Sequence, residues 1–117
     1  MTDIDTIIHV SDSDLERLCV AGIDAEESGD IEVAISLYKI ASSLGDLTSM
    51  TRLADILSEP PKFQDVTAAE KLYMRACLAG HAIACGNLAI LYNQLGKSVL
   101  SQKYLNLAKS RGDSWED

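Results

Sequence analysis

The chain has 117 residues, about the length of one domain, and its 18 acidic and 10 basic residues give a net charge of −8. No run of about 18 apolar residues occurs, so we expect no transmembrane helix. The N-terminus lacks the basic and apolar stretches of a signal peptide. The three cysteines, Cys19, Cys77 and Cys85, lie within apolar helical patterns, which favours free buried thiols and a cytoplasmic location.

The negative charge is concentrated in the first quarter of the chain. Residues 1–32 contain ten acidic residues and one basic residue, whereas residues 33–117 contain eight and nine. The first segment therefore carries −9 and the remainder +1. Such a field repels nucleic acid and anionic membranes, so we expect neither as a partner, and it favours a basic protein or peptide. The alternative is a solvated acidic face that only aids solubility.

Apolar residues recur at helical spacing along most of the chain, and nothing indicates a strand. The pattern predicts an all-α fold with helices at about 14–28, 31–44, 47–57, 66–79, 81–94 and 98–111. Candidate N-terminal caps are Ser13 or Asp14, Asp30, Asp46, and Asp65 or Thr67. A glycine follows five of the helices, and Pro60–Pro61 stop the third. The short connections predict antiparallel neighbours.

One domain, residues 14–112, contains all of these helices. Residues 1–13 form a polar N-terminal arm, which we expect to be loose or to lie extended on the first helix. Residues 113–117 form a C-terminal tail. Its Trp115 either covers the open end of the last helix pair or is free for contact.

Three helix ends share one spacing, in which two large residues are followed by a small residue and then a glycine. The segments are Leu37-Tyr38-x-x-Ala41-x-x-x-Gly45, Leu72-Tyr73-x-x-Ala76-x-x-x-Gly80 and Tyr104-Leu105-x-x-Ala108-x-x-x-Gly112. Around Gly80 the pattern extends to Ala84, Leu88, Ala89 and Tyr92. This spacing resembles tetratricopeptide-like repeats and, within them, the Sel1-like group. The resemblance implies a short right-handed α-solenoid of about three antiparallel helix pairs.

The resemblance also implies where a partner binds, because the first helix of each pair lines the concave surface of such arrays. The candidate partner-binding residues at those positions are Glu16, Ile23, Glu26, Glu27, Asp55, Glu59, Ile90 and Asn93. Their carboxylates would steer a basic partner toward the surface, and the two isoleucines would anchor it. Alternatively, Ile23 and Ile90 pack beneath neighbouring helices.

One group of residues is spaced for chemistry. Cys77, His81 and Cys85 lie four apart, which on a single helix would favour a metal site or a thiolate–imidazole pair. Gly80 should break the helix between Cys77 and His81, however, so the common face is lost. We therefore expect no metal, no cofactor and no enzymatic activity.

The resemblance thus implies a non-catalytic protein–protein interaction module, an adaptor or scaffold that binds a partner in an acidic concave groove. One alternative is a bacterial immunity protein that neutralises a basic toxin, since the charge of a small acidic protein complements a cationic nuclease. Another is a small Cys/His metal protein or enzyme. We expect a monomer, or a weak homodimer formed through the open ends of the array.

Overall fold

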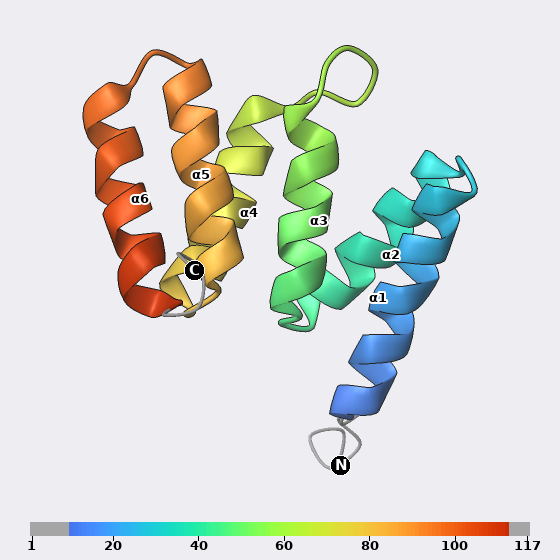
Figure 1. Cartoon of the computed structure of the whole chain (residues 1–117). Helices are drawn as coiled ribbons and strands as arrows, with labels where there is room; N and C mark the ends of the chain where they lie inside the picture. Colours follow the sequence, from blue (N-terminus) through green and yellow to red (C-terminus); the bar gives the residue numbers. More distant parts are fainter. Residues whose placement is uncertain (1–9, 113–117) are drawn as a thin grey trace, which may run out of the picture.

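The computed structural model describes residues 10–112, and this part of the chain is all-helical, with no strand (Figure 1). Its helices are α1 (Asp12–Glu27), α2 (Ile31–Ser43), α3 (Leu47–Ser58), α4 (Val66–Leu78), α5 (Ala82–Gln94) and α6 (Ser98–Arg111). The all-α prediction is confirmed, and the predicted helix ends agree to within about two residues. The first nine residues of the predicted arm and the tail with Trp115 lie outside the described residues.

Side-chain caps begin α1, α3 and α4, whereas Asp30, which was predicted to cap α2, makes no side-chain cap hydrogen bond. Asp46 begins α3 by accepting the backbone N–H of Ser49 at 2.9 Å, and Asp65 begins α4 by accepting that of Ala68 at 3.1 Å. The prediction for α1 was wrong by two residues. Ser11 has an extended backbone and accepts the N–H of Asp14 at 3.1 Å, so it caps the helix ahead of the predicted residues.

The helix ends explain most of the repeated spacing. Gly45 has φ 98°, and the N–H of Asp46 after it bonds to the carbonyl of Ala41 at 3.0 Å. This is a Schellman ending, in which the small residue of the pattern supplies the acceptor. The same ending occurs at Gly29, Gly80 and Gly96. Gly112 differs: its φ is −130°, so the third copy of the spacing ends its helix in another way.

The helices pack in the order of the chain. Each contacts the helices before and after it, and in addition α1 contacts α3 and α3 contacts α5. As a result α3 lies in the middle, with α1 and α2 on one side and α4 and α5 on the other (Figure 1). The buried residues form two clusters, a larger one spread over α3 to α6 and a smaller one centred on Ala34, Tyr38 and Leu53.

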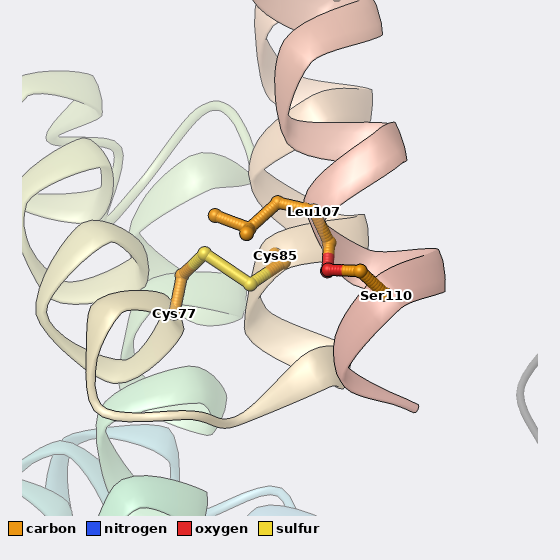
Figure 2. Close-up of a disulfide and its surroundings, with 4 residues drawn as sticks. All are labelled: Cys77, Cys85, Leu107 and Ser110. Carbon is orange, nitrogen blue, oxygen red and sulfur yellow. A yellow bond between two sulfur atoms is a disulfide. The ribbon is translucent and has the colours of Figure 1, made fainter. Parts of the chain in front are cut away.

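Cys77 and Cys85 form a disulfide, which corrects the expectation of three free thiols (Figure 2). The chain reverses direction at Gly80 and His81. Because one cysteine lies four residues before His81 and the other four residues after it, the reversal brings the two together. Leu107 of α6 lies beside the bond (Figure 2). Cys19 is free and buried, as predicted. With two of the three cysteines oxidised, cysteine usage no longer supports a cytoplasmic location.

None of the described helices combines the length and the apolarity needed to cross a bilayer.

A candidate partner-binding groove

Two cavities adjoin the C-terminal half of α3, and both are lined by Asp55 and Glu59. The first, which we call the amide cavity, has a volume of about 310 Å³ and lies between α3, α4 and α5. Its lining residues are Asp55, Ser58, Glu59, Tyr73, Asn87, Ile90, Leu91 and Gln94. The second, the proline cavity, has a volume of about 420 Å³ and is lined by Glu26, Ile31, Asp55, Ile56 and Glu59–Phe63. We call the two together the α3 groove.

Asp55 is the residue around which the groove is built. Its Oδ1 accepts a hydrogen bond from the hydroxyl of Tyr73 and another from Nδ2 of Asn87 at 3.1 Å. Two helices, α4 and α5, therefore hold this carboxylate oxygen of α3. Burial raises the pKa of Asp55, and the two hydrogen bonds oppose the rise because they favour the ionised form. The carboxylate is thus half-buried and fixed in orientation.

The same arrangement of a buried tyrosine and a carboxylate occurs elsewhere along the molecule. The hydroxyl of Tyr38 donates to Oε1 of Glu26 at 2.8 Å, and that of Tyr92 donates to Glu70. The rings of these tyrosines are buried in the helix interfaces. Burial and the neighbouring carboxylate both raise the pKa of each phenol, so the tyrosines remain neutral donors. The packing residues of the repeated spacing thereby orient carboxylates at the surface.

Four of the predicted partner-binding residues line the α3 groove. Glu26 lines the proline cavity, and Asp55 and Glu59 line both cavities. Ile90 lines the amide cavity and is 58% exposed, so this isoleucine is available at the surface.

The other four lie elsewhere. Glu16 lines a separate cavity near the start of α1, together with Asp46. Ile23 is half-buried and packs against the smaller core cluster, which is the alternative placement considered for it. Glu27 and Asn93 are exposed and line neither cavity of the groove.

Sequence reasoning missed Asn87 and the hydrogen-bonding role of Tyr73. A signal for Asn87 exists, because it is the single polar side chain within residues 82–91. An amide in such an apolar segment needs a partner, and here the partner is Asp55, 32 residues earlier. Helical register alone does not indicate that Asn87 and Asp55 lie close together in the fold.

The charge of the groove is mainly negative. Glu26, Asp55 and Glu59 face it, and burial raises the pKa of Asp55 although the charge of Arg52, one turn earlier on α3, opposes this rise. Lys62 at the rim lies 3.9 Å from Glu32, and both side chains are exposed, so this ion pair is weak. Within residues 10–112, no Lys or Arg forms an ion pair with Asp55.

The cysteines and His81 do not assemble a reactive site in this structure. The disulfide occupies both sulfurs, and no cluster of three or more His, Cys, Asp or Glu residues within positions 10–112 is placed to hold a metal ion. Burial lowers the pKa of His81.

A scan against protein-family models finds no match to the chain, and searches of curated proteins and of solved structures also find none.

Proposed function

We propose that the chain is a non-catalytic protein-interaction module that binds a segment of a basic partner in the α3 groove. The observation that carries this proposal is the convergence of two cavities on Asp55, a carboxylate held in place by hydrogen bonds from two other helices. A positioned carboxylate beside an exposed isoleucine suits a partner that is basic and partly apolar.

The proposed architecture is a short right-handed solenoid of three helix pairs, similar to Sel1-like repeats. In such an array α1, α3 and α5 are the first helices of their pairs and line one face. The contacts of α3 with both α1 and α5 support this arrangement. So do the Schellman endings, which recur after α2 and α4.

Selection of peptides on the full chain tests the proposal. A random peptide library is displayed and selected, and the best peptides are synthesised and titrated by calorimetry. We expect the selected peptides to be basic and to contain an apolar residue. Failure to select any peptide that binds saturably would contradict the proposal.

Two pairs of matched variants locate the binding surface. Ile90→Ala is compared with Ile83→Ala, since both isoleucines lie on α5 with similar exposure, 58% and 54%, but only Ile90 lines the groove. Because it removes an anchoring side chain, Ile90→Ala should weaken peptide binding about tenfold, whereas Ile83→Ala should leave the affinity unchanged.

Glu59→Lys is compared with Glu27→Lys, which changes the net charge equally at an exposed position outside the groove. At about 0.15 M salt, long-range attraction is screened, so only the first change should weaken binding strongly. Equal losses in both variants would show that net charge, and not the groove, determines binding.

A further inference from the structure

The hydrogen bonds inside the amide cavity leave several acceptors free and use both hydroxyl donors and one N–H of Asn87. The hydroxyl of Tyr73 and one N–H of Asn87 are donated to Oδ1 of Asp55. The hydroxyl of Ser58 is donated to the backbone carbonyl of Asp55 at 2.9 Å. Because the carboxylate takes the NH₂ side of the Asn87 amide, the amide oxygen is turned away from it and remains an acceptor.

The free acceptors come from different elements. Oδ2 of Asp55 makes no hydrogen bond with another residue of the described range, and the carboxylate of Glu59 lies at the end of α3. Asn87 and Gln94 add amide oxygens from α5. With two carboxylates and two amide oxygens available, a complementary ligand carries several donors and a positive charge. Among protein side chains, arginine and lysine meet these requirements.

The walls of the cavity suit the stem of such a side chain. Ile90, Leu91 and the ring of Tyr73 are apolar surfaces beside the polar groups. Long cationic side chains commonly lay their methylene groups along apolar surface while the charged head reaches polar groups. The volume of about 310 Å³ is small for a ligand pocket and fits one side chain better than a larger ligand.

The partly desolvated state of Asp55 favours arginine over lysine. Burial raises the pKa of this carboxyl, and among residues 10–112 no cation lies at ion-pair distance from it. A partly buried carboxylate gains most from a cation that loses little hydration. The guanidinium group is less strongly hydrated than an ammonium group, and its planar fork can reach two acceptors at once.

We propose that the amide cavity is a binding site for an arginine side chain of the partner, with Asp55 and Glu59 as its charge partners and Asn87 as a neutral acceptor. This assignment rests on the proposed function, because it supplies the chemistry by which the partner is recognised.

Titration of the full chain with small probes tests the assignment directly. The probes are N-acetyl-L-arginine methylamide, the corresponding lysine compound, and the citrulline compound, which has nearly the shape of arginine but no charge. Binding is followed by NMR at the side-chain amides of Asn87 and Gln94 and at the δ1 methyl group of Ile90. We expect saturable shifts with arginine, weaker binding with lysine, and at least about tenfold weaker binding with citrulline.

Variants separate the cavity from the rest of the acidic surface. Asp55→Asn and Glu59→Gln should each weaken binding of the arginine probe, whereas the matched surface change Glu27→Gln should not alter it. Because Glu59 is exposed, Glu59→Gln should leave the core intact, and a loss of binding in this variant then reflects the site itself. Lysine binding more tightly than arginine, citrulline binding as well as arginine, or no saturable shift at these groups would each overturn the assignment.

The peptide selection and the probe titration together distinguish failure of the arginine site from failure of the proposed function. Selected peptides that bind with dependence on Ile90, but lack arginine and are indifferent to Asp55→Asn, would overturn the arginine site and leave the groove as the binding surface. An arginine probe that binds while no peptide can be selected would overturn the proposed function, and with it the assignment to a partner's side chain.

Discussion

The close contact between α1 and α2 at Gly22 gives a prediction that the structure can quantify. A Cβ atom at Gly22 would lie 2.4 Å from Cε1 and 2.7 Å from Cδ1 of Tyr38. Carbon atoms in favourable contact are about 3.5–4.0 Å apart, so the ring would have to move by about 1 Å. The side chain of Tyr38 is fully buried, and its hydroxyl is bonded to Glu26, so both the packing and this hydrogen bond oppose movement of the ring.

We expect Gly22→Ala to lower the free energy of unfolding by about 1–2 kcal/mol. Forcing an extra methyl group into a packed interface costs about 1–3 kcal/mol, and the upper half of that range applies because the contact is so short. Replacing glycine by alanine in a helix returns up to about 1 kcal/mol. The steric cost therefore exceeds the gain in helix propensity.

Urea denaturation measures the effect, with an expected fall of the midpoint by about 0.3–2 M at an unchanged slope. Tyr38→Leu removes the ring atoms that the new methyl group would meet. In that background Gly22→Ala should be neutral or stabilising by up to about 1 kcal/mol. An equal loss of stability in both backgrounds, or no loss in either, would refute the steric argument.

Three other predictions test separate features. Unfolded but unreduced protein should expose one titratable thiol, that of Cys19, and three thiols before reduction would disprove the disulfide. Reduction should lower the free energy of unfolding by about 2.5 kcal/mol, because it opens the short loop that the disulfide closes. Gly45→Ala should cost about 1–2 kcal/mol because φ is 98°, although nothing lies within 4 Å of the new Cβ, and an unchanged urea midpoint would contradict this. Since burial raises the pKa of Asp55, its charge opposes folding above the folded-state pKa, and the penalty vanishes below the unfolded-state pKa of about 3.9. Asp55→Asn should therefore raise the urea midpoint at pH 7, with a gain that shrinks on acidification, whereas a lower midpoint at pH 7 would contradict the sign.

Helix starts and ends were largely predictable because their causes are local. An aspartate can accept the backbone N–H three residues later, as at Asp46 and Asp65, although Asp30 at the start of α2 makes no such bond. The glycine endings are equally local. Ser11 was missed because several polar residues near the start of α1 can serve as caps, and only the backbone geometry selects one of them.

The prediction that Cys77 and Cys85 are free thiols was wrong, although the helix break assumed at Gly80 is correct. Gly80 does break the helix, so Cys77 and Cys85 do not share a helical face. The two helices that result run side by side, however, and residues equally far from the reversal then face each other. The symmetric spacing about His81 was the available signal.

The candidate site was predictable only in part, because it depends on how helices distant in sequence are placed. Asp55, Glu59 and Ile90 were selected through the concave positions that the resemblance implies, and all three line the amide cavity. Glu16 and Glu26 lie ten residues apart on α1, about 15 Å along the helix, and so cannot line one small cavity. The bond between Asp55 and Asn87 joins α3 to α5, and no local pattern specifies it.

The packing of each helix mainly on its neighbours in the chain has a consequence for how the molecule opens. Contacts between successive elements require only short loop closures, which is typical of proteins that fold in microseconds to milliseconds. The smaller core cluster joins α1 and α2 to the remainder, whereas α3 to α6 share the larger cluster and the disulfide. Amide hydrogen exchange should therefore be faster in α1 and α2. The proline cavity would then be lost in each such opening, and the amide cavity would persist.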